Sequence, residues 1–254
     1  MTAALALPTF APLPEASPIA AVLADVVRAA SARAPRSRQR AVGPSEIGTP
    51  CARRLAYRAL DVDPVTGAGG DPWASIVGTA VHVWLAAAFE ADNRRRAAPR
   101  WLVEQRVTVS GSIRGTVDLY DGETATVVDH KVLGAASMKR VKAEGAGEPY
   151  RSQAHLYGYG LAAAGLPVER VAVAAYPRSG FLADLYVWSE PYSEARAVAA
   201  LDRLAAVVSV AGLLDVDTFP ARWALIPADP AGCAFCPYLR AGLASACADG
   251  CPGT

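Results

Sequence analysis

The spacing of hydrophobic and polar positions changes several times along the chain, and each change marks a predicted element. A recurrence of apolar residues every three to four positions predicts helices over residues 19–31, 53–60, 76–96, 150–164 and 193–214. Alternation of apolar and polar residues predicts strands over residues 101–110, 113–120, 124–133, 168–176 and 181–187. The dipeptide Asp121-Gly122 predicts a tight turn between the second and third strands. This order indicates an α/β domain with a mixed central sheet flanked by helices.

The 254 residues are enough for one large domain with a small appendage. We assign residues 1–43 to an N-terminal arm and helix of unknown role, and residues 44–254 to the main domain. The arm lacks the basic start and cleavage site of a secretory signal. We expect no apolar run to be long enough to cross a bilayer, and therefore a cytoplasmic protein without a membrane partner.

The charges nearly cancel, with 25 Lys and Arg against 24 Asp and Glu. A nucleic-acid-binding function would therefore depend on local basic patches rather than on a global field. Taken singly, each patch is more often a solvated face. The candidate patches are Arg36/Arg38/Arg40, Arg53/Arg54/Arg58, Arg94/Arg95/Arg96 and Lys139/Arg140/Lys142.

Two aspartates and a lysine lie inside the apolar second and third strands. Since side chains alternate along a strand, Asp129 and Lys131 share one face and His130 points to the other. The turn brings Asp118 close to Asp129. Buried charges are costly unless they are paired or bind a metal, and a divalent cation relieves the repulsion between two carboxylates. Lys131 would then orient or deprotonate an attacking water. The alternative is a salt bridge on an exposed sheet face.

Asp118 followed by Asp129-His130-Lys131 resembles the signature of the PD-(D/E)xK nucleases. The resemblance implies a restriction-endonuclease-like core. It implies that Asp118 and Asp129 bind a divalent metal, with the backbone carbonyl of His130, and that Lys131 acts on the water.

Two helical features narrow the resemblance to the RecB-like branch of that superfamily. Gln153 and Tyr157 lie one turn apart, as in its Q-x-x-x-Y motif, and are implied to position the substrate or Lys131. His82 matches the helical histidine that binds metal in this branch. An imidazole ligand suits Mn²⁺ at least as well as Mg²⁺. Without the resemblance, both features would be ordinary parts of amphipathic helices.

Five cysteines flank the predicted nuclease motifs. Cys51 precedes them, and Cys233, Cys236, Cys247 and Cys251 follow. Structural disulfides are rare in the cytosol, so the spacing favours a metal site. The chemistry of four thiolates suits either zinc or an iron–sulfur cluster.

The cysteine order resembles that of the iron–sulfur RecB-like exonucleases, which are the AddB-type nuclease domain, the CRISPR-associated adaptation exonucleases and their phage relatives. The resemblance implies a [4Fe–4S] cluster on Cys51, Cys233, Cys236 and Cys251. Cys247 is the alternative to Cys251 as the fourth ligand. The cluster would pack a cysteine-rich tail on the N-terminal helical region.

The resemblance implies a Mg²⁺- or Mn²⁺-dependent deoxyribonuclease. This would be an exonuclease that works 5′ to 3′ on single-stranded or free DNA ends in recombination, repair or CRISPR adaptation. Implied partners are DNA, further copies of the chain, and recombination or CRISPR proteins. A DNA-binding adaptor subunit is the second function considered, and the intact acidic residues and Lys131 argue against it. A site-specific endonuclease of the same superfamily is the third, and the cysteine set argues against it.

Overall fold

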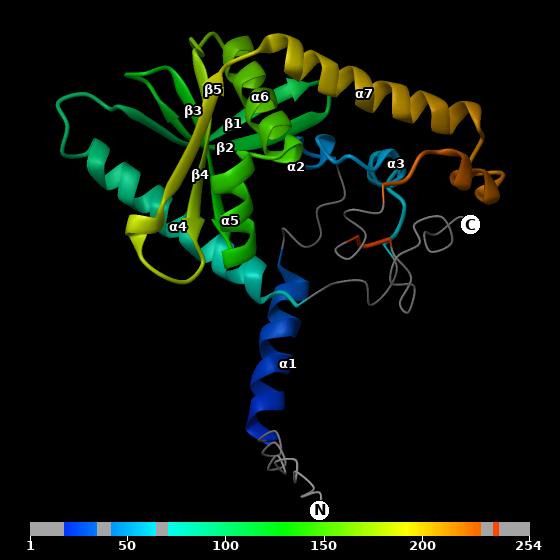
Figure 1. Cartoon of the computed structure of the whole chain (residues 1–254), viewed down its shortest axis with the longest axis horizontal. Helices are drawn as coiled ribbons and strands as arrows, with labels where there is room; N and C mark the ends of the chain where they lie inside the picture. Colours follow the sequence, from blue (N-terminus) through cyan, green and yellow to red (C-terminus); the bar gives the residue numbers. More distant parts are fainter. Residues whose placement is uncertain (1–17, 35–41, 65–70, 230–235, 239–254) are drawn as a thin grey trace, which may run out of the picture. The chain divides into compact units, whose positions relative to one another are not determined.

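The computed structural model describes residues 18–34, 42–64, 71–229 and 236–238. The chain divides into two units, residues 1–39 and 40–254. The first contains helix α1 (Pro18–Arg33), which confirms the predicted helix over 19–31 (Figure 1). Apolar residues on this helix, among them Val22, Leu23 and Val26, are largely exposed.

The second unit is built on a five-stranded sheet in the order β1-β2-β3-β4-β5. Strands β3 and β4 are parallel, and the other neighbouring pairs are antiparallel. The predicted mixed sheet is therefore confirmed. The strands are β1 (Trp101–Ser110), β2 (Ile113–Asp121), β3 (Thr126–Leu133), β4 (Arg170–Pro177) and β5 (Tyr186–Pro191).

Helices precede, connect and follow the strands of this sheet. The α-helices are α2 (Pro44–Ile47), α3 (Ala52–Ala59), α4 (Trp73–Asn93), α5 (Ala135–Glu144), α6 (Glu148–Ala163) and α7 (Glu194–Leu213). There are also two 3₁₀ helices, η2 (Leu182–Asp184) between β4 and β5, and η3 (Pro220–Leu225) after α7. The predicted helices are all present. Helix α5 was not predicted, because it buries only Met138 and Val141 and so has a weak apolar pattern.

Two predictions about the strands are wrong. The strand expected over 181–187 begins only at Tyr186, because Phe181 and Leu182 are exposed and lead into η2 instead of pairing. The turn after Asp121 is wider than a two-residue hairpin. Asp121 pairs with Thr126, so the loop spans residues 122–125.

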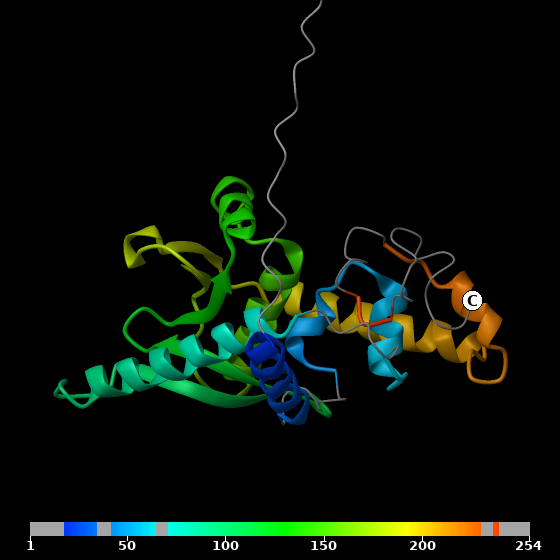
Figure 2. The same cartoon turned by 90° about the horizontal axis from the view of Figure 1, so that it is seen from below.

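Helices α4 and α6 cover opposite faces of the sheet, as the alternation along β3 shows (Figure 2). The His130 ring stacks on Phe89 of α4, with ring centroids 5.8 Å apart. The next residue, Lys131, contacts Gln153 of α6 on the other face. Most of the core lies on the α6 face, where Val127 of β3 and Leu156 of α6 are fully buried.

The alternation of β1 is reset at Glu104, whose φ is +48°. Leu102 and Val107 are five positions apart, so regular alternation would place them on opposite faces of the sheet, yet both pack in the same core. The ladder with β2 pairs Val103 with Leu119 and Gln105 with Val117, and it omits the pair between Glu104 and Asp118. The two strands therefore depart from regular pairing at these two acidic residues.

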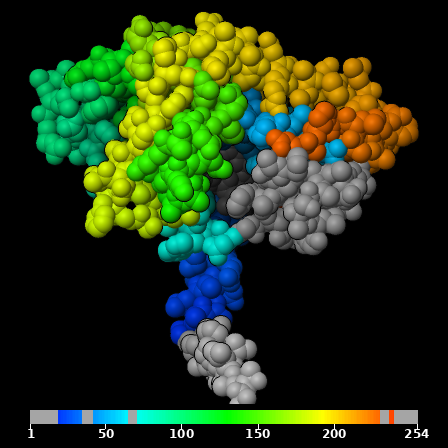
Figure 3. Space-filling view, viewed as in Figure 1, coloured from blue at the N-terminus to red at the C-terminus, as the bar shows by residue number. Residues whose placement is uncertain are grey.

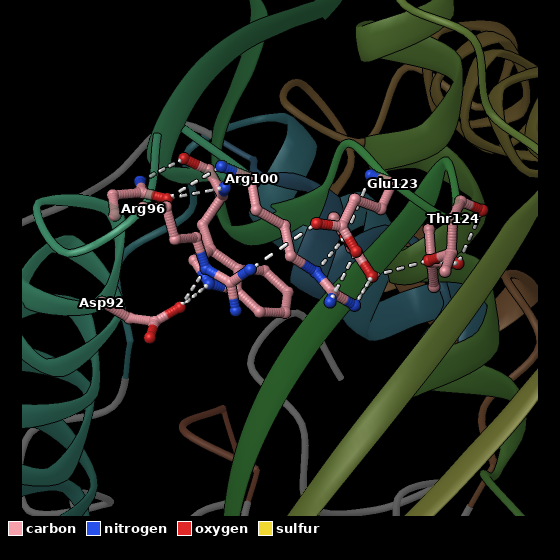
Figure 4. A network of polar contacts seen from close by, with 9 residues as sticks. Asp92, Arg96, Arg100, Glu123 and Thr124 are labelled. Carbon is pink, nitrogen blue, oxygen red and sulfur yellow. Dashed lines mark hydrogen bonds and ion pairs between the residues drawn. The ribbon is translucent and has the colours of Figure 1, made fainter. Parts of the chain in front are cut away.

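A polar network fixes the C-terminal end of α4 to the sheet (Figure 4). The Asn93 side chain accepts hydrogen bonds from the backbone N–H groups of Arg100 and Trp101, each at 3.0 Å. The Arg100 guanidinium donates to both carboxylate oxygens of Asp121, at 2.8 and 2.7 Å. It also pairs with Glu123 at 2.7 Å. This network sets the position of the helix that carries His82.

Helix α4 has 21 residues and contains an 18-residue stretch with a mean hydropathy of 1.4, so by length and composition it meets a criterion for crossing a membrane. The prediction that no segment reaches this length is wrong on that criterion. A helix of a folded domain can pass the same test, and α4 packs on the sheet through His82, Phe89 and Asn93. Its other side exposes Val83 and Trp84.

Candidate active site

Three side chains from three consecutive elements converge at the irregular point of the sheet. His82 of α4, Glu104 of β1 and Asp118 of β2 each offer a ligand atom, and these atoms all lie within 4.8 Å of one another. His82 Nδ1 lies 3.3 Å from Asp118 Oδ1. Glu104 is exposed, while His82 and Asp118 are partly buried.

Asp118 reaches both this cluster and the neighbouring strand. Pairing between β2 and β3 ends at Leu119 and Val128, one residue before Asp118 would face Asp129. Beyond this point, the backbone N–H of His130 donates to the Asp118 side chain, at Oδ2, at 2.7 Å. Burial opposes ionisation of Asp118, but the hydrogen bonds from His82 and from the His130 backbone outweigh it, so the pKa of this carboxyl is lowered.

The hydrogen bond to Asp118 raises the pKa of His82 above its ordinary value, against the lowering effect of burial. The carboxylate and the imidazolium therefore stabilise each other. Metal binding would require the neutral imidazole, since a histidine must be neutral to act as a ligand.

A second chain of contacts begins at Asp129, which is 1% exposed. Its Oδ2 atom lies 2.6 Å from Lys131 Nζ. Lys131 Nζ also donates to Gln153 Oε1 at 2.9 Å, and Gln153 Nε2 donates to the Tyr157 hydroxyl at 3.2 Å. The predicted shared face of Asp129 and Lys131 is confirmed, and so is the shared helix face of Gln153 and Tyr157.

Burial raises the pKa of Asp129 to about 6 even though Lys131 acts to lower it. The negative charge of Asp118 acts in the same direction as burial. Without a metal ion, Asp129 is thus a carboxylate in an unfavourable environment. A divalent cation next to it would remove that cost.

Gly115 explains why Tyr157 can lie so close to β2. A Cβ atom at this position would lie 2.7 Å from Tyr157 Cε1 and 3.0 Å from Pro44 Cγ. Only a glycine leaves room for the tyrosine ring above the strand. The segment from Gly115 to Asp118 therefore carries a donor of the metal cluster and also leaves room for Tyr157, whose helix face contacts Lys131.

The His130 side chain lies away from Asp129, as predicted. It packs among Phe89, Tyr176 and His82, and burial lowers the pKa of His130 to about 4. Its buried Nδ1 atom has no hydrogen-bond partner among the described residues. Metal binding by the His130 carbonyl stays a prediction.

Glu104 was missed by the reasoning from sequence. The predicted metal ligands were His82, Asp118 and Asp129, whereas the compact donor cluster contains Glu104 in place of Asp129. The available signal was an acidic residue in β1 at the point where apolar alternation changes parity. This signal identifies Glu104 as a metal ligand only when the register between β1 and β2, which places it opposite Asp118, is known.

The donor cluster fits a divalent metal ion by its chemistry. Two carboxylates and one imidazole form the mixed oxygen and nitrogen set that Mn²⁺ accepts, and Mg²⁺ takes the carboxylates readily. The adjacent Asp129 adds a further carboxylate. The residues present therefore suit the metal that the sequence predicts.

The described cysteines are Cys51 and Cys236, and both are buried without a disulfide. Cys51 caps helix α3, and its Sγ atom accepts a hydrogen bond from the Arg54 backbone N–H at 3.3 Å. The other predicted cluster ligands, Cys233 and Cys251, lie outside the described residues, as does Cys247. A [4Fe–4S] cluster therefore stays a prediction.

The described part of the tail packs on helix α3. Cys236 and Tyr238 share a core cluster with Ala56 and Tyr57. The Tyr57 ring lies 4.9 Å from that of Tyr238 and 4.5 Å from that of Trp223. Residues 236–238 thus pack against the helix that Cys51 caps.

Two of the three arginines of helix α3 are bound within the fold, so they do not contribute to the basic DNA-binding face that we considered. Arg53 is buried, and its guanidinium donates to the carbonyls of Ile226 at 3.0 Å and Ala224 at 2.9 Å. Arg58 pairs with Glu46 at 2.6 Å. The patch at 36–40 lies outside the described residues.

No family model matches the chain, and no curated protein matches it. Two solved structures are similar. The crystal structure of an alkaline exonuclease (LHK-Exo) from Laribacter hongkongensis has a TM-score of 0.49 and 11% identity, over 75% of this chain and 96% of that chain. The structure of LHK-Exo in complex with dAMP has a TM-score of 0.48 and 12% identity, over 74% and 96%. A likeness of this extent does not establish function, so the residues of the site must carry the assignment.

Proposed function

We propose that the chain is a Mg²⁺- or Mn²⁺-dependent deoxyribonuclease with a restriction-endonuclease-like core. One observation carries the proposal. A cluster of metal-type donors, His82, Glu104 and Asp118, is joined through the His130 backbone to the strand that holds Asp129 and Lys131. An ordinary salt bridge would explain the Asp129–Lys131 pair, but it would not explain the donor cluster beside it.

In this proposal, His82, Glu104, Asp118 and Asp129 hold the metal ion. The bound ion supplies Lewis-acid stabilisation of the phosphodiester and lowers the pKa of a water molecule. Lys131 Nζ, held by Gln153, orients that water and offsets the negative charge that develops on the phosphoryl oxygens. Tyr157 fixes the Gln153 amide and so acts as a positioning residue.

The test is DNA degradation by the purified protein in Mg²⁺ or Mn²⁺. We expect Asp129→Asn and Lys131→Ala to lower the rate by at least 100-fold. The matched control is Asp202→Asn. Asp202 is exposed on α7 and far from the site in sequence, and this substitution removes the same charge as Asp129→Asn. If both site variants keep the control's rate, the active-site assignment is wrong.

We further propose that the enzyme is an exonuclease that works 5′ to 3′ on single-stranded ends, in recombination, repair or CRISPR adaptation. This rests on the resemblance of the motifs from His82 to Tyr157 to those of the RecB-like exonucleases, which implies this activity. Linear and circular single strands distinguish an exonuclease from an endonuclease, since only a linear strand has ends. Oligonucleotides labelled at one end or the other give the polarity: early release of a 5′ label as a mononucleotide supports the proposal, and early release of a 3′ label contradicts it.

We also propose a [4Fe–4S] cluster held by Cys51, Cys233, Cys236 and Cys251. The packing of the described tail on α3, with two buried thiols, supports a metal centre in this part of the fold. Bound metal there would stabilise the junction between α3 and the tail. The thiolate chemistry suits zinc as well as iron–sulfur.

Anaerobic purification with an absorption spectrum and an iron count tests the cluster without reference to activity. We expect brown protein with about four iron atoms per chain, as the cluster formula implies. Colourless protein that contains zinc and no iron would overturn this assignment. Loss of iron in Cys251→Ser but not in Cys247→Ser would identify the fourth ligand.

A DNA-binding adaptor remains the second candidate function. It predicts that DNA is bound but not degraded in Mg²⁺ or Mn²⁺, and that Asp129→Asn has no functional effect. The cost of burying Asp129 as a charged group argues for a catalytic site, since a binding module gains nothing from it.

A further inference from the structure

An open cavity of about 540 Å³ lies between α5 and the ends of strands β3 and β4. One side of α5 forms a wall, because its lining residues recur at helical spacing. Figure 3 shows α5 in green beside the yellow connection between β4 and β5, both on the exposed face. The residues that line the cavity are Leu133, Ala135, Met138, Lys139, Lys142, Ala143, Pro177, Ser179 and Asp184.

The cavity combines an apolar floor with a charged rim. Leu133 and Met138 are buried and form the floor, while Lys139 and Lys142 extend from α5 into solvent. Lys142 Nζ lies 3.9 Å from Asp184 Oδ1, and both side chains are about half exposed, at 43% and 55%. Such an exposed pair is weak, so Lys142 can exchange this partner for a stronger anion.

The position of the cavity relates it to the candidate active site. Leu133 follows Lys131 by two residues on β3, so both point to the same face, about 7 Å apart along the strand. Tyr150 contacts both Lys131 of the candidate active site and the floor of the cavity. Its ring lies 5.3 Å from Lys131 Nζ, and it packs against the cluster of Leu133 and Met138.

We infer that this cavity binds a nucleotide of the DNA strand next to the phosphodiester that is cleaved. The inference rests on the proposed nuclease function. Lys139 and Lys142, one helical turn apart, hold the phosphate, and the sugar and base pack on Leu133 and Met138. The contacts are to phosphate and apolar surface, so binding is independent of base sequence.

The charge pattern favours a phosphate backbone over other anionic ligands. Two ammonium groups face one carboxylate, so the rim is net positive but only weakly so. A compact multiply charged metabolite would need more cations around it. A strand with one charge per nucleotide needs one or two cations at each position, with apolar surface between them.

The test is the salt dependence of binding. Fluorescence anisotropy would follow a labelled oligothymidylate in EDTA, so that no cleavage occurs. For the double variant Lys139→Ala/Lys142→Ala, we expect weaker binding and a slope of log K against log salt that is smaller by about 0.7, since the two lysines hold one phosphate and each phosphate contact in a single strand contributes about 0.7. The control is Arg106→Ala/Arg114→Ala, which removes the same charge from exposed positions on β1 and β2.

Asp184→Asn supplies a test of opposite sign. Removal of this carboxylate eliminates repulsion of the phosphate and releases Lys142, so we expect binding to tighten several-fold. If these surface residues had only a structural role, the lysine substitutions would not weaken DNA binding while the neighbouring Asp184→Asn tightens it. The inference is overturned if the double variant keeps the slope of the control, or if Asp184→Asn weakens binding.

Steady-state kinetics separates this inference from the proposed function. If the wild-type protein degrades DNA, we expect the double lysine variant to raise KM several-fold with kcat nearly unchanged. An unchanged KM would overturn the cavity inference and leave the nuclease intact. If the wild-type protein degrades no DNA but the slope still falls, the cavity binds DNA and the nuclease proposal fails.

Discussion

The carboxylate of Asp118 accepts a hydrogen bond from the backbone N–H of His130, at 2.7 Å. This bond occurs where the ladder between β2 and β3 stops, and it replaces one ladder bond with a side-chain contact. His130 lies between Asp129 and Lys131 in the sequence. The bond therefore couples the donor cluster of His82 and Glu104 to the strand that carries the proposed catalytic lysine.

Glu104→Gln should weaken Mn²⁺ binding on the order of tenfold or more, because it removes one charged donor from the cluster. Isothermal titration calorimetry of the metal-free protein measures this directly. Glu169→Gln is the control, since Glu169 is exposed and precedes β4 outside the cluster. Equal Mn²⁺ affinity in the two variants would exclude Glu104 as a ligand.

Gln153→Ala should lower kcat by about 10- to 100-fold with a small change in KM, because Lys131 Nζ loses the acceptor that orients it. Tyr157→Phe should have a smaller effect, since it removes the bond between the hydroxyl and the Gln153 amide but leaves the bond between Gln153 and Lys131 in place. The order of the two effects is the informative result. A larger loss of kcat in Tyr157→Phe would mean that the tyrosine acts on the substrate and not through Gln153.

Gly115→Ala should destabilise the protein by about 1–3 kcal/mol, because the new methyl group overlaps Tyr157 and Pro44. Activity should fall further than stability explains, since displacement of Tyr157 also displaces Gln153. Chemical denaturation and rate measurements on the same sample separate the two effects. Gly212→Ala on α7 has open space around the new methyl group, so this control should be neutral or slightly stabilising.

Most strands of the sheet, and the faces that Asp129 shares with Lys131 and Gln153 shares with Tyr157, could be predicted from the sequence because they depend on local periodicity. Alternation along β3 places Asp129 and Lys131 on one face, and the spacing of one helical turn places Gln153 beside Tyr157. Both relationships hold in the structure. Chemistry that depends on neighbouring residues in one element is accessible in this way.

Two relationships between elements could not be predicted from local patterns. Glu104 joins the donor cluster only because its positive φ resets the alternation of β1 opposite Asp118, and no local pattern indicates that register. The burial of Arg53 also depends on a segment that is distant in the sequence. Its partners are carbonyls of Ala224 and Ile226, more than 170 residues away, so its charge suggested a DNA contact that the fold excludes.

Asp129→Asn should stabilise the metal-free protein above pH 6 while it removes activity. The pKa of Asp129 is about 6 in the folded protein, above its ordinary value of 3.8. A raised folded pKa means that this group contributes stability below pH 4, and that the contribution is lost as the pH rises through 6. Asparagine resembles the neutral acid, so it avoids this loss. One pKa unit corresponds to about 1.4 kcal/mol, so the advantage of the variant at pH 8 is on the order of 3 kcal/mol at most.

Urea denaturation in EDTA at intervals from pH 4 to 8 measures the difference in unfolding free energy between the two proteins. The difference should be small at pH 4 and should grow through pH 6. Asp118 is present in both proteins, so the effect of its lowered pKa largely cancels. Saturating Mn²⁺ should reverse the order, because only the wild-type carboxylate binds the ion well. A variant that is less stable than the wild type at every pH without metal would show that the Lys131 ion pair outweighs the burial of Asp129.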